Sequence, residues 1–366
     1  MSSIAQSGSV LSASLLEQVF SDAKAIARAR SLETFHLGNR RYLGGKSKLL
    51  DFIEATTLSV LGRNPTSVFD AFSGTGVVAS HFAELGSAVV GNDLLLHNSV
   101  AFEAFLSSEE IDLEGLAEKL LHLASLSGSE NYFSEHFGGT FFSEENAQRI
   151  GAIREEIDVI ADRGRERAAL LTSLFYGADR VANTVGHYDA FRRGAGDSRP
   201  LTLKFPLLRP WTVQHEWHQE DAVELAPKVK TEVAYLDPPY NSRQYSDAYH
   251  LLENLVRWEK PEVFGVARKM DRTNLKSDFC GRSAPKAFDD LIQGLNADLI
   301  LVSYNNNQTS MDARSNAAIS DEQLVSSLEK RGRVSVRETS FNFFSAGKTR
   351  PREHSERIFI CEVKPR

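Results

Sequence analysis

The stretch VFDAFSGTG, residues 68–76, decides the fold class, because it carries a short apolar strand into a glycine-rich turn. A helical pattern follows over residues 77–85 and ends at Gly86. A second apolar strand, residues 88–91, then runs into the polar pair 92–93. This order of strand, glycine turn, helix and strand is how a parallel sheet begins.

Strand patterns return in the second half of the chain, at residues 233–236, 299–303, 334–344 and 357–363. The last two resemble an antiparallel pair at the end of the sheet. The region between about 94 and 211 is mainly helical instead. The sequence therefore predicts an α/β fold: a Rossmann-like sheet with a terminal antiparallel hairpin and a mainly helical insertion.

The predicted division of the chain has three parts. Residues 1–33 form an N-terminal helical arm, with a helical pattern from Leu15 to Ala29. Residues 34–97 and 212–366 form the sheet domain, and residues 98–211 form an inserted domain. The chain of 366 residues is long enough to bury a sizeable core, and its 42% apolar and 25% charged content is typical of globular proteins.

Several classes of protein are excluded by composition. No apolar run approaches the roughly 20 residues of a membrane span, and the N-terminus lacks the pattern of a secretory signal. The two cysteines, Cys280 and Cys361, suit a reducing compartment and are too few for a zinc cluster. We therefore expect a cytoplasmic protein with no membrane partner and no metal.

Charge is spread unevenly along the chain, although the formal net charge is −7. Residues 98–162 hold fourteen acids and three bases, whereas residues 180–209 hold six bases and two acids. Residues 24–48 and 331–352 are also basic, each with a single acid. Because local charge rather than net charge sets an electrostatic footprint, these basic segments keep nucleic acid open as a partner.

The glycine turn has the features of a ligand site. Gly74 and Gly76 let the backbone pass close to a ligand, and Asp93 follows 17 residues after Gly76 at the end of the next strand. A carboxylate at that place can hold the two ribose hydroxyls of a nucleoside. With Ala79 the same turn also satisfies the dinucleotide fingerprint, so an NAD enzyme stays possible at this point.

A second unusual stretch, DPPY at residues 237–240, ends the strand at 233–236. Its two prolines fix the backbone and remove two N–H donors, which leaves the Asp237 carboxylate and nearby carbonyls as acceptors. Tyr240 offers a flat face on which a ring can stack. The stretch therefore suits a planar nitrogen heterocycle that carries an amino group. Acceptors on both amino hydrogens localise the nitrogen lone pair, so that it can attack a sulfonium methyl group directly.

The motifs together resemble the S-adenosylmethionine-dependent N6-adenine DNA methyltransferases of the DNA adenine methylase type. The stretch RYLGGK at 41–46 looks like the family's N-terminal cofactor motif, FSGTG at 72–76 like its glycine loop, and DPPY at 237–240 like its catalytic motif. The match covers roughly residues 39–96 and 215–305. The resemblance implies a methyltransferase fold, S-adenosylmethionine as cofactor and double-stranded DNA as substrate.

Site residues follow from the resemblance by position. Asp237, Pro238 and Tyr240 would be catalytic, with Tyr240 stacking on a flipped adenine. The cofactor would be bound by Tyr42, Lys46, Phe72, Gly74, Gly76, Asp93, Asp221 and Asp237. The family places target recognition between the glycine loop and DPPY. In the basic part of that region, DNA would be bound by Arg180, Asn183, Arg192, Arg193 and Arg199.

The alternatives are other enzymes of the same chemistry and one protein without activity. An N4-cytosine methyltransferase more often carries Ser before Pro-Pro, and a glutamine methyltransferase more often carries Asn. An RNA adenine methyltransferase shares the motifs. A non-catalytic nucleic-acid binder on this fold would have lost Gly74, Gly76, Asp237 or Tyr240, and all four are present. No motif supplies the proton donor that an NAD enzyme needs. The target sequence and a cognate restriction endonuclease as partner stay open.

Overall fold

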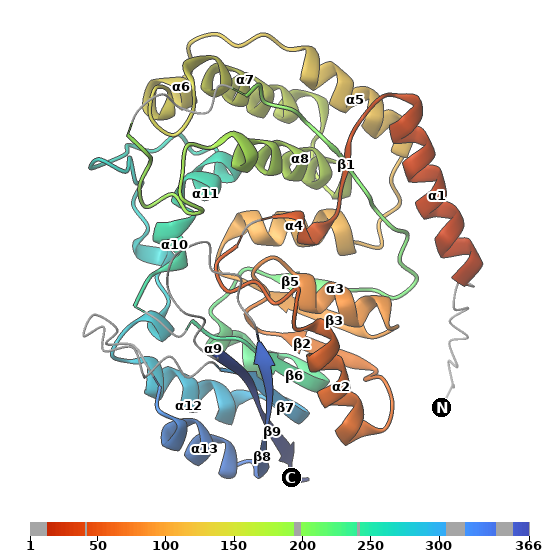
Figure 1. Cartoon of the computed structure of the whole chain (residues 1–366), viewed down its shortest axis with the longest axis vertical. Helices are drawn as coiled ribbons and strands as arrows, with labels where there is room; N and C mark the ends of the chain where they lie inside the picture. Colours follow the sequence, from red (N-terminus) through yellow and green to blue (C-terminus); the bar gives the residue numbers. More distant parts are fainter. Residues whose placement is uncertain are drawn as a thin grey trace, which may run out of the picture. The chain divides into compact units, whose positions relative to one another are not determined.

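The computed structural model describes residues 13–40, 42–193, 199–239, 242–304, 319–341 and 354–365. The chain divides into two compact units (Figure 1). The helical unit comprises residues 1–43, 96–215 and 249–271, and the sheet unit comprises residues 44–95, 216–248 and 272–366.

This division differs from the predicted boundaries in several places. The predicted N-terminal arm groups with the helical unit, and so do residues 96–97 and 212–215. Residues 34–43 group with the helical unit because β1 (Thr34–Phe35) pairs in parallel with β4 (Phe205–Pro206). Residues 249–271 also group with it, because α11 (His250–Arg257) packs on α4 (Leu96–Leu106) and α8 (Arg165–Val181). The predicted insertion at 98–211 is thus one part of a unit assembled from three stretches of chain.

The sheet unit contains a seven-stranded sheet in the order β5-β3-β2-β6-β7-β9-β8 (Figure 1). Its strands are β2 (Ser67–Asp70), β3 (Ala88–Asn92), β5 (Glu216–His218), β6 (Lys230–Leu236), β7 (Asn296–Ser303), β8 (Gly332–Phe341) and β9 (His354–Val363). The first five in the order pair in parallel, and β9 is antiparallel to both β7 and β8. The predicted Rossmann-like sheet with a terminal antiparallel hairpin is confirmed.

Helices cover both faces of this sheet, as continuous apolar strands require. One face packs through Ala234, Ile300 and Phe359 against α9, α12 and α13 in a single apolar cluster. Helix α3 contacts β2 and β3, and His81 of α3 lies 2.8 Å from Glu54 of α2. The helices and helical turns of this unit are α2 (Leu50–Leu61), α3 (Val77–Glu84), α9 (Ala222–Leu225), η2 (Ala226–Lys228), α10 (Tyr245–Ala248), η3 (Thr273–Leu275), η4 (Asp278–Cys280), α12 (Ala284–Gly294) and α13 (Asp321–Glu329).

The order of the strands creates one switch point, between β2 and β6. From β2 the chain moves outward to β3 and β5, and it then returns to β6 on the other side of β2. Ligands of open parallel sheets bind at the carboxyl ends of the strands where the order reverses in this way. The glycine turn follows β2 and the DPPY stretch follows β6, so both predicted motifs border that point.

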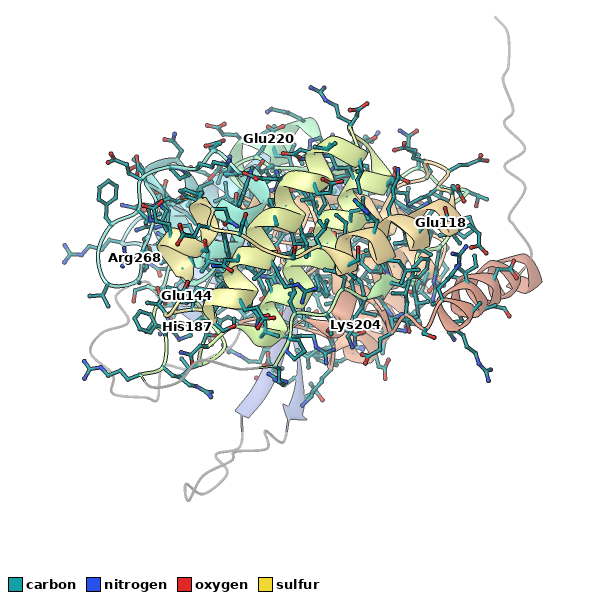
Figure 2. The ribbon with its side chains drawn as sticks, turned by 90° about the horizontal axis from the view of Figure 1, so that it is seen from above. Glu118, Glu144, His187, Lys204, Glu220 and Arg268 are labelled. Atoms are coloured by element: carbon teal, nitrogen blue, oxygen red, sulfur yellow. The ribbon has the colours of Figure 1, made fainter. Side chains whose placement is uncertain are left out.

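The helical unit is held by two buried arginines as well as by apolar packing. Arg154 donates to the carbonyls of Leu255 and Val256, and Arg165 donates to that of Ala104. Figure 2 shows Glu118 and Glu144 at the surface of this unit. Its remaining elements are α1 (Ala13–Ala29), η1 (Leu37–Asn39), α5 (Leu113–Ser125), α6 (Tyr132–Phe137) and α7 (Glu144–Ile160). Among the described residues, no helix has the length and apolarity to cross a membrane.

Candidate active site at the carboxyl edge of the sheet

Three carboxylates stand at the carboxyl ends of neighbouring strands. Asp70 ends β2, Asp93 follows β3, and Asp237 follows β6. The register pairs Asp70 with Tyr235, two residues before Asp237. The parallel sheet therefore brings together acids that are far apart in the sequence, and Asp93 and Asp237 are two of the predicted site residues.

Asp237 forms an ion pair with Lys46. Its Oδ2 lies 2.8 Å from Lys46 Nζ, and the side chains of Asp237 and Lys46 are only 16% and 8% exposed. The other oxygen, Oδ1, is buried without a hydrogen-bond partner in the described part of the chain. Burial raises the pKa of Asp237, and the charge of Lys46 acts against that rise. The pair thus presents one tethered oxygen and one that can accept a new hydrogen bond.

Asp70 is a more deeply buried acid. Its side chain is only 1% exposed, and neither oxygen makes a well-formed hydrogen bond with a described residue. Burial, followed by the charge of Asp237, raises the pKa of Asp70 to about 8, and the backbone N–H groups of Ala79 and Phe72 act against that rise. Asp70 is therefore protonated at neutral pH. Sequence reasoning assigned Asp70 no role, although the sequence already placed it next to the glycine turn at the end of a predicted strand.

Asp93 is tied to the glycine turn. Its Oδ2 accepts the Gly74 N–H at 3.0 Å, and its Oδ1 accepts the Leu95 N–H at 2.8 Å. Gly74 and Gly76 have φ values of +52° and +76°, a conformation that strongly favours glycine. The predicted turn and the predicted ribose-binding acid are thus adjacent in space. Phe72 packs edge-on against Phe279, with ring centroids 5.0 Å apart.

Asp221 occupies the first position before a short helix. Its side chain accepts the Val223 N–H at 2.8 Å and caps α9. The preceding residue, Glu220, exchanges two hydrogen bonds with the Asn92 side chain at the end of β3. Asp221 therefore lies near the end of β3, the strand that Asp93 follows. Its predicted contact with the cofactor adenine stays a prediction.

Some predicted residues fall outside the described part of the chain. Tyr240 is one of these, and so is Arg41 of the N-terminal motif. Pro238 is buried directly after Asp237. The stacking role of Tyr240 stays a prediction. Within the described ranges, no group of three His, Cys, Asp or Glu side chains could hold a metal ion.

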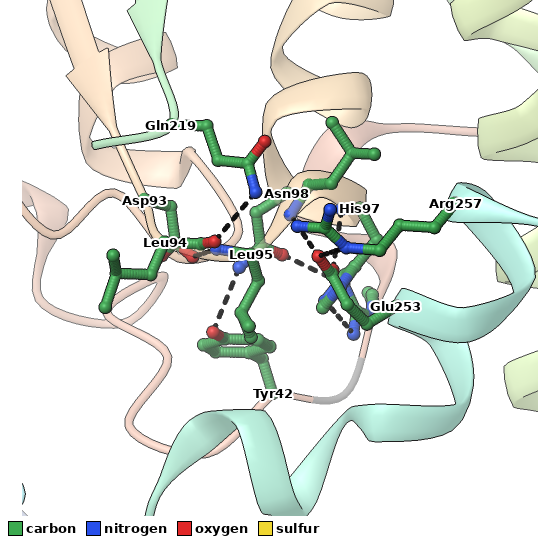
Figure 3. A network of polar contacts seen from close by, with 11 residues as sticks. Tyr42, Asp93, Leu94, Leu95, His97, Asn98, Gln219, Glu253 and Arg257 are labelled. Atoms are coloured by element: carbon green, nitrogen blue, oxygen red, sulfur yellow. Dashed lines mark hydrogen bonds and ion pairs between the residues drawn. The ribbon is translucent and has the colours of Figure 1, made fainter. Parts of the chain in front are cut away.

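Tyr42 belongs to the helical unit, where it takes part in an aromatic stack. Its ring lies parallel to that of Tyr249, with centroids 4.5 Å apart, and the Arg40 guanidinium is 5.3 Å from its centroid. Its hydroxyl accepts a hydrogen bond from Asn98 Nδ2 at 3.0 Å (Figure 3). The Tyr249 hydroxyl accepts the Leu43 N–H at 2.8 Å, so it fixes the start of the N-terminal motif. Sequence reasoning assigned no chemistry to Tyr249.

A buried polar network supports this stack. Glu253 is fully buried, and its carboxylate accepts hydrogen bonds from the Leu96 N–H, the His97 ring and the Arg257 side chain (Figure 3). Burial lowers the pKa of His97 to about 4, which makes its ring neutral at pH 7. His97 Nδ1–H then donates to Glu253, and His97 Nε2 accepts from Arg40 at 3.1 Å. Each ring nitrogen thus has a defined partner.

The predicted DNA-binding residues have two different environments. Arg180, Arg192, Arg193 and Arg199 are exposed. Asn183 is buried, and its amide group donates to the carbonyls of Thr140 and Arg192 at 3.0 and 2.9 Å. Because both amide hydrogens already hold the loop together, Asn183 has a structural role here and is left out of the proposed DNA interface.

Glu253→Ala should lower the free energy of unfolding by about 3–5 kcal/mol, the usual cost of removing one partner from a buried charged network. Glu259→Ala is the matched control, because Glu259 is 70% exposed and lies 3.9 Å from the same Arg257. It should change stability by less than about 1 kcal/mol. Urea unfolding of the three proteins measures both values. Equal losses in the two variants would contradict the role given to Glu253.

Asp70→Asn should remove a pH dependence of stability. A carboxyl group with a pKa of about 8 in the folded protein and about 4 in the unfolded chain binds its proton more tightly when folded. The protonated Asp70 therefore contributes its full share to the free energy of unfolding at low pH. This share is lost as the pH rises from about 4 to 8, at up to about 1.4 kcal/mol per pH unit. Unfolding of wild type and Asp70→Asn between pH 5 and 9 should show their difference growing in favour of the variant. A constant difference would mean that Asp70 is ionised throughout.

Comparison with known proteins identifies the family of this chain. A sequence profile described as D12 class N6 adenine-specific DNA methyltransferase matches residues 42–305. Modification methylase StsI from Streptococcus sanguinis is 30% identical over 89% of this chain, and Type II methyltransferase M.NlaIII from Neisseria lactamica is 30% identical over 86%. Type II methyltransferase M.FokI from Planomicrobium okeanokoites is 29% identical over 80%.

The matches differ in how much of each relative they cover. The chain spans about half the length of StsI and M.FokI, at 52% and 47%, and 95% of M.NlaIII. The profile covers the glycine turn and both residues of the ion pair, Lys46 and Asp237. The chain belongs to the family of D12 class N6 adenine-specific DNA methyltransferases.

Proposed function

We propose that this protein transfers a methyl group from S-adenosylmethionine to N6 of an adenine flipped out of double-stranded DNA. The observation that carries the proposal is the Oδ1 atom of Asp237, a buried carboxylate oxygen with no partner among the described residues. Lys46 holds the other oxygen at 2.8 Å, so the free one is fixed in place. An exocyclic amino group supplies the N–H donor that this acceptor lacks.

The residues of the carboxyl edge fit S-adenosylmethionine, which carries a sulfonium and an ammonium group. Asp70 brings two oxygens without well-formed hydrogen bonds to this edge, and Asp93 is anchored beside the glycine turn. Positive φ values at Gly74 and Gly76 form a turn with no side chain to fill it. When bound, the cofactor supplies a methyl group on a positively charged sulfur, which an amine can accept directly.

Asp237 has two tasks in the proposed reaction. It accepts a hydrogen bond from one N6–H of the adenine. This hydrogen bond favours a lone pair that is localised on the nitrogen and no longer conjugated with the ring. It also has a pKa raised by burial, so it can hold the proton that the nitrogen sheds once the new N–C bond has formed. Lys46 orients the carboxylate and stabilises its charged form. The prolines after Asp237 add acceptors but no competing N–H donors.

The substrate side of the proposal rests on the predicted residues and on family membership. Tyr240 would stack on the flipped base, and the exposed arginines of the segment 180–199 would contact DNA. The names modification methylase and Type II methyltransferase of the relatives support a cognate restriction endonuclease as a partner. Both cysteines are buried free thiols, and a cytoplasmic location stays the prediction.

Asp237→Ala should reduce methyl transfer by about 100-fold or more, because it removes the acceptor and the proton-holding group together. Asp237→Asn should also be slow, because it keeps an acceptor oxygen but loses the charge that pairs with Lys46. Asp298→Ala is the control, because Asp298 is an exposed acid on β7 of the same unit. The measurement is nucleoside analysis of DNA from a methylation-free host expressing each variant. N4-methylcytosine as the wild-type product would refute adenine as the target base.

Asp93→Ala should raise KM for S-adenosylmethionine much more than it changes kcat or DNA affinity. A ribose contact is present in both ground and transition states, and losing such uniform binding appears in KM. Asp93→Asn keeps an oxygen for the Gly74 N–H and should show a smaller rise. Steady-state kinetics with varied cofactor separate the two constants. An unchanged KM in both variants would place the ribose site elsewhere.

A further inference from the structure

Three of the residues at which the chain passes between its two units are close in sequence to the candidate active site. These residues are Leu43, Leu96 and Tyr249. They stand three residues before Lys46, three residues after Asp93 and twelve residues after Asp237. Contacts that fix these three residues within the helical unit therefore also fix where the segments that carry the site residues begin or end.

Tyr249 contacts two successive residues of the N-terminal cofactor motif. Its side chain is fully buried, and its hydroxyl accepts the Leu43 N–H at 2.8 Å. Its ring stacks on that of Tyr42, with the centroids 4.5 Å apart and the planes only 5° from parallel. One side chain thus holds the ring of Tyr42 and the backbone of Leu43 at the same time.

The first turn of α11 ties Tyr249 to the third passage residue, Leu96. The Glu253 N–H donates to the Tyr249 carbonyl at 3.1 Å, and the Glu253 carboxylate accepts the Leu96 N–H at 2.9 Å. Two residues after Leu96, the side-chain amide of Asn98 donates to the Tyr42 hydroxyl (Figure 3). The three passage residues and Tyr42 therefore belong to one connected set of hydrogen bonds and ring contacts.

The segment between Leu43 and Lys46 depends on its two ends. It consists of Gly44 and Gly45, which are exposed and have no side chain that could pack on the protein. At one end, the Lys46 ammonium donates to the Gly44 carbonyl at 3.2 Å and pairs with Asp237 at 2.8 Å. At the other end, the Leu43 N–H is bound to the Tyr249 hydroxyl. Removing that hydroxyl therefore frees the motif at the end opposite to the ion pair.

Tyr176 makes a comparable hydrogen bond six residues earlier in the same stretch of chain. It is 7% exposed, and its hydroxyl donates to the Leu37 carbonyl at 2.6 Å. Leu37 lies outside the motif RYLGGK at 41–46, and the residues just before it are also held by the pairing of β1 with β4. The two tyrosines thus fix the same stretch of backbone, but only Tyr249 acts on the cofactor motif.

We propose that Tyr249 is a positioning residue for the cofactor, because its ring and hydroxyl hold Tyr42 and Leu43 in the arrangement that S-adenosylmethionine binds. The inference rests on the proposed function, which supplies the cofactor. Tyr249 acts through the motif and does not touch the reacting atoms. It sets the fraction of molecules whose motif is arranged for binding, and the apparent Kd is inversely proportional to that fraction.

The test is calorimetric titration of the full chain with S-adenosylmethionine in the absence of DNA. Tyr249→Phe keeps the stacked ring and loses the acceptor for the Leu43 N–H. If the competent fraction falls to about a tenth, Kd rises about 10-fold. Tyr249→Leu loses the stack as well and should raise Kd further. Steady-state kinetics of Tyr249→Phe should show a raised KM for the cofactor, with kcat and DNA affinity close to those of wild type.

Tyr176→Phe is the matched control, because it also removes one buried hydroxyl from a backbone hydrogen bond of the helical unit. Urea unfolding should show similar losses of stability in the two phenylalanine variants, whereas Kd should rise in Tyr249→Phe alone. Hydrogen exchange gives a second readout: the Leu43 amide should exchange faster in cofactor-free Tyr249→Phe than in wild type, and saturating cofactor should slow it again.

Two results would overturn the inference. One is a Tyr249→Phe variant that binds S-adenosylmethionine as tightly as wild type does. The other is an equal rise of Kd in Tyr176→Phe, since a general loss of stability would then account for both. If the wild type itself does not bind S-adenosylmethionine, the proposed function fails. If the wild type binds it and Tyr249→Phe binds it equally well, only the role of Tyr249 fails.

Discussion

The ion pair between Asp237 and Lys46 is the interaction on which the proposed chemistry of the sheet unit depends. Three carboxylates end at one edge of a parallel sheet, and the register of β2 and β6 fixes two of them as neighbours. Their mutual repulsion and burial favour protonation, as the pKa of about 8 for Asp70 shows. Lys46 counters this for Asp237 alone. Lys46 therefore stabilises the charged form of Asp237, whereas burial and the neighbouring carboxylates favour the protonated form of Asp70.

Much of the sheet was predictable because its strands are continuous apolar runs. The predicted strands at 233–236, 299–303 and 357–363 lie within β6, β7 and β9. The predicted strand at 334–344 overlaps β8 as far as Phe341 and then leaves the described residues. The position of β9 between β7 and β8 was not predicted. The sequence pattern of an antiparallel pair is the same whichever of its two strands is hydrogen-bonded to the rest of the sheet. Strand β5 was missed because it has three residues, all at least partly exposed.

The candidate site was predictable where a residue follows a strand and unpredictable where a tertiary contact decides its role. Asp93 and Asp237 stand out because acids end apolar strands next to turn residues. The pairing of Lys46 with Asp237 joins residues 191 positions apart in the chain, and no local pattern encodes it. For Asn183, too, the structure shows a tertiary role that the sequence did not indicate. Its polar side chain in a basic segment suggested contact with DNA, whereas the side chain is only 8% exposed and donates to two backbone carbonyls.

The net charge is a poor guide to what this chain binds, because acidic and basic side chains are concentrated in different regions of the structure. Several acids of the segment 98–162 form ion pairs at the surface, as in the pairs of Glu114 and Glu118 with Arg30. A cavity in the helical unit gathers five cations and a single acid among its described lining residues. The carboxyl edge of the sheet unit gathers acids around one lysine. One acidic protein thus contains a basic local field in its helical unit and an acidic one at the carboxyl edge of its sheet unit.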